Sequence, residues 1–388
     1  MTAQHHNHRI YLDYHATTPV DPRVAQLVYH YMTTVFGNAS STDHVFGDEA
    51  GEAVAEAKQQ IARLINCSPK EVIFTSGATE SINLAIQGLL LKSSKTMKLA
   101  VLPVEHKAVL DTCASMAKKG LTEVIFLKVD NRACLDLEEL ERVCRQGIDL
   151  LCLMAANNEV GTIYPLPEVG EIVQRYGVRW LCDASQAVGK IHLDFDRWGI
   201  SFLAISGHKF YAPKGVGALV IRRGQFLEPI LYGGGHQRGL RSGTLNVPGI
   251  AGLGEACRLR LLEMTEDETR VEQQRNRLQY LLQTGIENLV VNGDVNHRLA
   301  GNLHVSIPGI PNSAIIARVR HRIAISTGSA CSSGVEAPSH VLRAMQLPDV
   351  VIDGALRIGL GKFTTDDEVE QAAQIIINTV LEIQNYFT

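Results

Sequence analysis

The sequence predicts an α/β protein, in which a mostly parallel sheet has helices on both faces and is joined to a smaller α+β domain. Short apolar runs rich in β-branched residues alternate with helical patterns over the first part of the chain. After Pro248 the pattern changes to a charged helical stretch and scattered short strands. The length of 388 residues also exceeds what one hydrophobic core usually organises. We therefore expect a large domain and a smaller one.

Seven short apolar runs mark the predicted strands of the large sheet. They cover residues 72–75, 99–104, 123–129, 149–154, 178–183, 201–206 and 217–222. Helical patterns separate most of them, and the segment from Asp48 to Asn66 has apolar residues at helical spacing with acidic residues in its first turn. Such alternation favours mostly parallel strands in one seven-stranded sheet.

The smaller domain is predicted from the remaining segments. A helical stretch runs to Asn288, short strands follow near 302–307, 323–326 and 355–360, and a last helix spans about Thr365 to Tyr386. We assign residues 16–247 to the large domain, and residues 1–15 with 248–388 to the small α+β domain. The chain has no Gly/Ser linker, so the two domains are expected to pack together.

The composition excludes several classes of protein. Apolar residues make up 45%, charged residues 20%, and the net charge is -4, which provides no basic field for nucleic acid or a membrane surface. No run approaches the roughly 18 apolar residues of a membrane span, and the first residues lack a signal-peptide core. We expect a cytoplasmic protein with a small-molecule ligand.

The eight cysteines form no C-x-x-C pair, which argues against a zinc site or a disulfide framework. Seven are interpreted as small core residues: Cys67, Cys113, Cys134, Cys144, Cys152, Cys182 and Cys257. His5, His6 and His8 are interpreted as a solvated terminus, so no metal is expected.

Lys209 is the first candidate for catalysis. It follows the strand-like run SFLAIS in Ser206-Gly207-His208-Lys209. Parallel sheets bind ligands at the carboxyl ends of their strands, and a desolvated lysine there becomes a Schiff-base nucleophile. Taken alone, a lysine is more often a solvated surface residue.

Asp183 changes that balance. It ends the run VRWLCD, and a carboxylate at this edge suits the pyridinium nitrogen of pyridoxal phosphate (PLP), which needs such a partner to act as an electron sink. Helix capping is an alternative role for Asp183, and both roles are compatible.

The segment from Thr75 to Ser81 lies between a strand and a helix and is rich in small and hydroxyl residues. Backbone N–H groups at such a helix start bind phosphate, although a capping box would explain Thr79 equally well. Gly207, Gly215 and Gly217 are consistent with a turn that brings backbone close to a cofactor, or with any sharp turn.

Together, these motifs resemble the cysteine desulfurases of the NifS/IscS type, which are fold-type I PLP enzymes related to class V aminotransferases. The resemblance covers nearly the whole chain. It rests on the ordered motifs IYLDYHATTPVDPRV, FTSGATES, EHKAVLDTC, NNEVGT, CDASQAVGK, SGHKFYAPKGVGAL, GGGHQRGLRSGT and STGSACSSG.

The resemblance implies a role for each matching residue. Lys209 would form the internal Schiff base, Asp183 would bond the pyridine nitrogen, His106 would stack on the ring and shuttle a proton, and Gln186 would reach the phenolic oxygen. The phosphate would be held by Ala78, Thr79, Ser206 and His208. Asn158 would lie beside cofactor and substrate, and Arg357 would grip the substrate carboxylate. Thr244 would reach the PLP of the other subunit, which implies a homodimer. Without the resemblance, His106 and Arg357 are as easily ordinary polar residues.

Cys331 indicates the substrate. It lies in a polar loop of small residues, about 326–336, where a thiol can be deprotonated. The resemblance implies that this thiol takes sulfur from L-cysteine as a persulfide, leaving L-alanine, and passes it to acceptors such as those of iron-sulfur cluster assembly. An incidental exposed cysteine is the alternative.

Other functions remain open on sequence alone. A selenocysteine lyase or a cysteine-sulfinate desulfinase would use the same residues. An aminotransferase would release a keto acid and have no use for Cys331. A non-catalytic sulfur-carrier protein would keep the fold without turnover.

Overall fold

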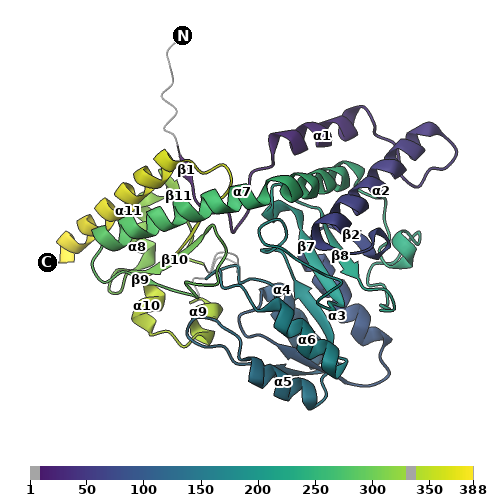
Figure 1. Cartoon of the computed structure of the whole chain (residues 1–388), viewed down its shortest axis with the longest axis horizontal. Helices are drawn as coiled ribbons and strands as arrows, with labels where there is room; N and C mark the ends of the chain where they lie inside the picture. Colours follow the sequence, from purple (N-terminus) through teal and green to yellow (C-terminus); the bar gives the residue numbers. More distant parts are fainter. Residues whose placement is uncertain (1–8, 329–337, 388) are drawn as a thin grey trace, which may run out of the picture.

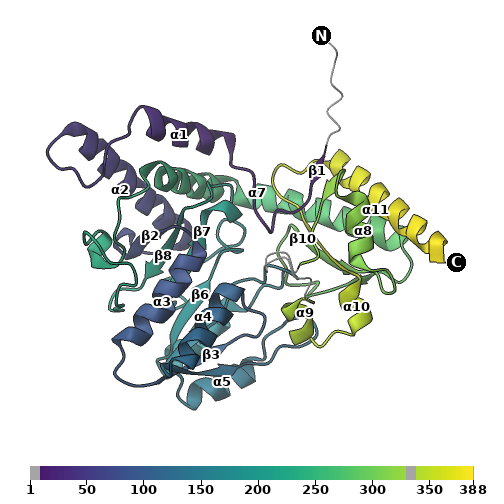
Figure 2. The same cartoon turned by 180° about the vertical axis from the view of Figure 1, so that it is seen from behind.

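The computed structural model describes residues 9–328 and 338–387. The N-terminal histidines, Cys331 and most of its predicted loop lie outside these residues. Two sheet-containing regions lie at opposite ends of the long helix α7 (Val247–Gly285), as Figures 1 and 2 show. The division into domains at residues 16–247 stays a prediction, since α7 packs against helices of both regions.

The larger region contains the predicted seven-stranded sheet, in the order β2-β8-β7-β6-β5-β3-β4. Only β8 runs antiparallel to its neighbours. The strands are β2 (Val72–Thr75), β3 (Met97–Val101), β4 (Thr122–Phe126), β5 (Leu150–Cys152), β6 (Arg179–Asp183), β7 (Phe202–Ser206) and β8 (Gly217–Ile221). Several predicted runs extend past the strand end, because their last apolar residues are also buried in the core: Leu102, Val104, Leu127 and Leu153.

Helices cover both faces of this sheet, as predicted. One face packs against α2 (Val45–Ile65), α5 (Leu137–Arg145), α6 (Leu166–Tyr176) and the start of α7, and the other against α3 (Ala78–Lys92) and α4 (Lys107–Lys118). Successive residues of β7 alternate between these two cores: Leu203 and Ile205 join the first, and Phe202 and Ala204 the second. A strand buried on both faces in this way explains the continuous apolar run in the sequence. Helix α1 (Pro22–Thr33) packs on α7.

The smaller region has its own core around the antiparallel sheet β12-β10-β9. Its strands are β9 (Val290–Val291), β10 (Asn302–Ser306) and β12 (Ala355–Gly359), while β1 (Ile10–Tyr11) pairs in parallel with β11 (Ile323–Ala324). The helices here are α8 (Asn312–Val319), α9 (His340–Ala344), α10 (Asp349–Asp353) and α11 (Asp366–Phe387), of which α11 packs on α7 and α8. Short 3-10 turns complete the fold: η1 (Pro69–Glu71), η2 (Gly207–Lys209) and η3 (Gln237–Gly239).

The described cysteines are all free thiols. Five are buried, and Cys67 is partly buried and packs against the large core, but the prediction of a core residue is wrong for Cys134, which is partly exposed. Cys134 lies in the connection between β4 and α5, where its thiol donates to Asp294 Oδ2 at 3.4 Å.

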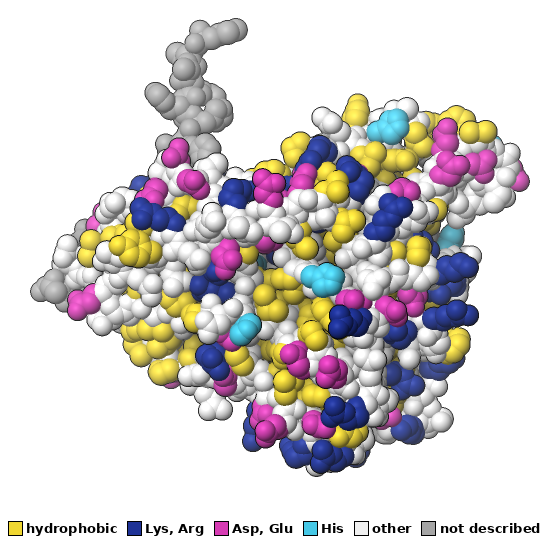
Figure 3. Space-filling view, in the orientation of Figure 1, with side chains coloured by type: hydrophobic (Ala, Val, Ile, Leu, Met, Phe, Trp, Pro, Cys, Tyr) yellow, Lys and Arg dark blue, Asp and Glu magenta, His cyan; other side chains and the backbone are white. Residues whose placement is uncertain are grey.

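The charges on the surface are mixed in sign (Figure 3), in agreement with the small net charge of -4. Basic and acidic side chains are interspersed over the lower half of the face in Figure 3. Among the described helices, none is long and apolar enough to cross a membrane.

Candidate active site

A cavity of about 620 Å³ lies between the carboxyl edge of the large sheet and the smaller region. It brings together almost every residue that the sequence singled out, from segments far apart in the chain. Its lining includes Ala78, Thr79, His106, Asn158, Asp183, Gln186, Ser206, His208, Lys209 and Arg357. Thr244 is exposed and does not line this cavity.

Lys209 projects from η2, directly after β7. Its Nζ donates to the carbonyl oxygens of His15, at 2.7 Å, and Ala16, at 2.8 Å. The same N-terminal segment holds the neighbouring residue, because Thr18 Oγ1 donates to the His208 carbonyl at 3.0 Å. A backbone strap over residues 15–18 therefore fixes the position of the lysine.

His208 is a neutral group at this edge. Burial, with the nearby Lys209 and Lys214 cations, lowers its pKa to about 4. Its Nδ1 lies 3.1 Å from Thr17 Oγ1. At neutral pH the ring therefore offers hydrogen bonds rather than a charge.

Asp183 ends β6 and is 7% exposed. Its Oδ1 accepts hydrogen bonds from the Ser185 backbone N–H at 3.0 Å and the Ser185 hydroxyl at 2.5 Å. These bonds close a turn, and no helix begins in the described segment between β6 and β7, so the helix-capping alternative for Asp183 is wrong. The same bonds fix the orientation of the Asp183 carboxyl group at the edge of the sheet.

Glu105 is a buried carboxyl group beside Asp183 that the sequence analysis missed. Burial raises the pKa of Glu105 well above its ordinary value, and the negative charge of Asp183 adds to the effect. Its Oε1 accepts the Met154 backbone N–H at 2.6 Å. Held neutral, Glu105 supports the loop of His106 without adding a second charge.

The start of α3 forms another end of the cavity. Gly77 is its N-cap, has a φ of 152°, and provides no side-chain cap, so the capping-box alternative for Thr79 is wrong. A Cβ on Gly217 would lie 2.3 Å from the Ile205 carbonyl oxygen and 2.7 Å from the Gly77 Cα, so only glycine permits this close approach. The uncapped N–H groups of this turn suit a phosphate.

Arg357 comes from β12 in the smaller region and is 4% exposed. Its Nη2 donates to Asp13 Oδ1 at 2.9 Å, and its Nη1 to the Asn158 carbonyl at 3.3 Å. The opposing effects on the pKa of Asp13 leave it raised, because burial outweighs the guanidinium. These two bonds hold Arg357 at the cavity wall, and its Nε has no hydrogen-bond partner among the described residues.

Glu159 is a second buried carboxyl group that the sequence analysis missed. Burial raises its pKa to about 7. Its Oε1 lies 3.8 Å from His304 Nε2, and a Cβ on Gly328 would lie 2.6 Å from the same oxygen. Glu159 therefore lies where the larger region contacts two parts of the smaller one, His304 in β10 and Gly328 after β11.

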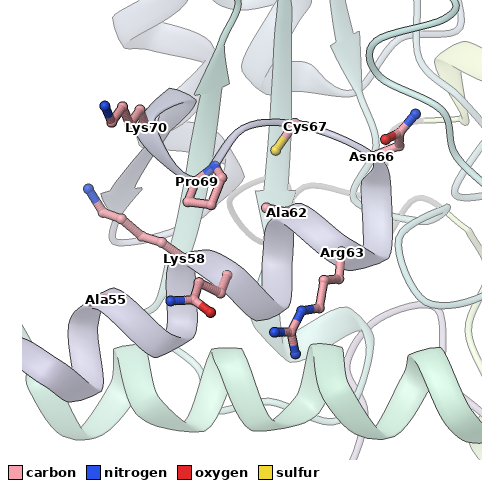
Figure 4. A pocket seen from close by; sticks show the side chains of 9 residues that line it. Ala55, Lys58, Ala62, Arg63, Asn66, Cys67, Pro69 and Lys70 are labelled. Carbon is pink, nitrogen blue, oxygen red and sulfur yellow. The ribbon is translucent and has the colours of Figure 1, made fainter.

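A second hollow, of about 610 Å³, lies between α2 and η1 and shares no residue with the first (Figure 4). Lys58, Arg63 and Lys70 give it a basic lining. Cys67 also lines it, but burial raises the pKa of that thiol to about 12, which leaves it protonated and unreactive. None of the predicted site residues lies here.

Comparison with known proteins gives the family. The family described as aminotransferase class-V matches residues 10–372. This chain belongs to the class-V aminotransferases. It is 43% identical to the cysteine desulfurase IscS of Anaeromyxobacter dehalogenans (strain 2CP-C), over 97% of this chain and 93% of the relative. It is 44% identical to the IscS of Neisseria meningitidis serogroup C / serotype 2a (strain ATCC 700532 / DSM 15464 / FAM18), over 95% and 91%.

Solved structures agree with this placement in the class-V aminotransferases. A NifS-like protein has a TM-score of 0.89 at 35% identity, covering 97% of this chain and 100% of its own. A structure described as SspA in complex with cysteine has a TM-score of 0.81 at 31% identity, covering 92% and 100%. The predicted family and fold are confirmed.

Class-V aminotransferases are PLP-dependent, and the residues of the cavity fit that group. An amine, a buried carboxylate and an uncapped helix start surround the cavity, and each matches one functional group of the cofactor. His15 Nε2 is a buried nitrogen without a hydrogen-bond partner in the described part of the chain. An unpaired buried polar atom facing a cavity is consistent with a bound ligand.

Proposed function

We propose that this chain is a PLP-dependent cysteine desulfurase, which converts L-cysteine to L-alanine and leaves a persulfide on Cys331. The observation that carries the proposal is that Lys209, Asp183 and Arg357 line one cavity. The relatives named cysteine desulfurase, and the SspA structure with bound cysteine, support the choice of substrate.

When bound, PLP supplies an electron sink for the charge that forms when the substrate loses its Cα proton. Lys209 Nζ would hold the cofactor covalently and would take the Cα proton of the substrate. Asp183 would pair with the pyridine nitrogen. The start of α3, with Thr79, Ser206 and His208, would hold the phosphate, while His106 and Gln186 would hold the ring and its phenolic oxygen.

The substrate binds at the opposite wall of the cavity, which carries Arg357. The Arg357 fork binds the carboxylate of L-cysteine, beside Asn158, and so orients the Cα proton toward Lys209. Asp13 occupies part of this fork and keeps the guanidinium in place before substrate arrives.

The sulfur step balances as a transfer between two thiols. The Cys331 thiolate attacks the substrate sulfur, so that an S–S bond forms while the Cβ–S bond breaks. The electron pair of that bond passes to the substrate carbon, which is reduced and takes up a proton to become the methyl group of L-alanine. Cys331 then carries the sulfur as a persulfide, for a sulfur acceptor protein such as one of iron-sulfur cluster assembly.

A homodimer with Thr244 at the partner's PLP phosphate completes the proposal. Two contacts hold the segment of Thr244 to the large sheet and α3: Gln237 pairs with the Phe74 backbone at 2.7 Å, and Arg241 Nε donates to Glu80 Oε1 at 2.9 Å. Thr244 is itself exposed, and the nearby Phe226, Leu231 and Tyr232 are 69%, 45% and 78% exposed. Several exposed large apolar side chains in one stretch of the chain support a protein interface. The free thiols support a reducing compartment such as the cytoplasm.

Product analysis tests the proposal. Purified protein with L-cysteine should give L-alanine, and the C331S variant should keep the visible cofactor band but form neither alanine nor sulfide. Unchanged turnover in C331S would refute the role of Cys331, and a keto acid product would indicate an aminotransferase. Higher activity on L-selenocysteine or L-cysteine sulfinate than on L-cysteine would favour the selenocysteine lyase or the desulfinase.

A further inference from the structure

His15 lies in the strap between β1 and α1, and neither the family match nor the proposed function gives it a role. It is 2% exposed, its ring lines the cavity, and its Nε2 lacks a partner within the described residues. Its Nδ1 lies 3.2 Å from Gln186 Oε1. The protonation of the ring therefore decides what it presents to a ligand.

Two neighbours fix the orientation of the Gln186 amide. The His15 carbonyl oxygen can only accept, so the amide atom 2.9 Å away must be Nε2. On the other side, Lys190 Nζ donates to Oε1 at 3.0 Å. Since Oε1 can only accept, His15 Nδ1 must carry the hydrogen in its own contact with Gln186.

His15 Nε2 is therefore a bare nitrogen. Burial lowers the pKa of His15 well below its ordinary value, and the cations that face it, Lys190, Arg357 and Lys209, act in the same direction. A neutral ring with a hydrogen on Nδ1 leaves a lone pair on Nε2. The ring is also wedged in place, because a Cβ on Gly359 would lie 2.8 Å from His15 Cδ2.

We propose that His15 contacts the substrate: its Nε2 accepts a hydrogen bond from the α-amino group of the incoming amino acid, while its Nδ1–H holds Gln186. The position of Lys209 supports the amino group as the donor. Lys209 Nζ lies against the carbonyl oxygens of His15 and Ala16, and the substrate amine that takes its place at the cofactor arrives at the same strap. The two strap carbonyls already accept from Lys209 Nζ, which leaves His15 Nε2 as a further acceptor beside them.

The inference rests on the proposed function of Lys209, and a matched pair of variants separates the two functions of the ring. In H15N, the amide nitrogen reproduces the Nδ1 donor to Gln186 but nothing replaces Nε2. In H15Q, the longer amide reproduces an acceptor near the Nε2 position but loses the bond to Gln186.

The first readout is the spectral titration of each holoenzyme with L-alanine, which has the amino and carboxylate groups but no thiol. We expect H15N to weaken L-alanine binding about tenfold, as for the loss of one hydrogen bond, and H15Q to stay within about twofold of the parent. The second readout is the pH midpoint of the visible cofactor band, which should shift in H15Q and stay unchanged in H15N.

Inhibition by 3-mercaptopropionate, which lacks the amino group, is the control and should be equal in H15N and the parent protein. Parent-like L-alanine binding by H15N would overturn the proposal, as would weaker 3-mercaptopropionate inhibition, which would place the contact at the thiol. Loss of the cofactor from H15N would also count against it. If the parent holoenzyme shows no spectral response to L-alanine, the proposed function fails instead.

Discussion

The two sheets contribute different parts of one site. The carboxyl edge of the seven-stranded sheet supplies Asp183, Ser206 and Lys209, which we propose face the cofactor, whereas β12 of the small sheet supplies Arg357, which we propose binds the substrate. If these proposals hold, the main groups for the cofactor and for the substrate carboxylate come from separate structural regions that meet at the cavity.

The segment between β1 and α1, which includes the strap, joins the two sets of residues. Asp13 pairs with Arg357, and two residues later the carbonyl oxygens of His15 and Ala16 accept from Lys209. Because the two sets lie on different sheets, variants should separate into those that change cofactor binding and those that change only substrate affinity.

The largest effect is expected at Lys209. K209A removes both the covalent attachment of the cofactor and the base, so activity on L-cysteine should fall by about 10²- to 10⁴-fold, with loss of the visible Schiff-base band. K70A, at an exposed lysine in the second hollow, is the control. Activity of K209A near that of K70A would break the assignment of the large sheet.

A variant of Asp183 also tests the proposed cofactor role of the large sheet. D183N keeps acceptors for Ser185 but removes the charge, so kcat should fall by about 10²- to 10³-fold while the KM for L-cysteine changes little. A lower affinity for PLP should accompany the change. An effect on KM alone would place Asp183 on the substrate side instead.

A variant of Arg357 tests whether the small sheet affects substrate affinity without affecting cofactor binding. R357K keeps the charge but loses the bidentate fork, so the KM for L-cysteine should rise by about 10- to 100-fold. The cofactor band and PLP affinity should match those of the parent protein. Loss of PLP from R357K would break the separation between the two sheets.

The smallest effect concerns Glu159, between the two regions. Because its pKa rises from 4.5 to about 7 on folding, its ionisation opposes folding. Stability from this group is complete below pH 4.5 and is lost as the pH rises to about 7, at a cost of about 3 kcal/mol. E159Q should therefore gain stability relative to the parent between pH 5 and pH 8, measured by urea denaturation. A difference that is constant with pH would show that Glu159 is ionised in the folded protein.

The sequence predicted the fold well, because each central strand is an apolar run bounded by polar residues that carry the chemistry. Asp183 and Lys209 could be predicted for this reason: Asp183 ends β6, Lys209 lies three residues after β7, and parallel strands place their carboxyl ends at one edge. Helix α7 was harder to predict. Its charged later half suggested the small region alone, while its earlier half packs against α2 in the large core.

The missed residues share one property, which is that long-range packing gives them their role. His15 was missed because its partner Gln186 lies 171 positions away, and nothing near either residue in the chain indicates that they touch. Glu159 looks like an ordinary charge in NNEVGT until burial beside His304 raises its pKa. Their signal was their place inside motifs that were attributed to other residues.

Mass spectrometry of Cys331 after a single addition of L-cysteine is the sharpest test of the proposed persulfide. We expect one added sulfur on the peptide that contains Cys331, in an amount equal to the L-alanine released, and none in K209A. Alanine release with an unmodified Cys331, or sulfur on a different cysteine, would contradict it.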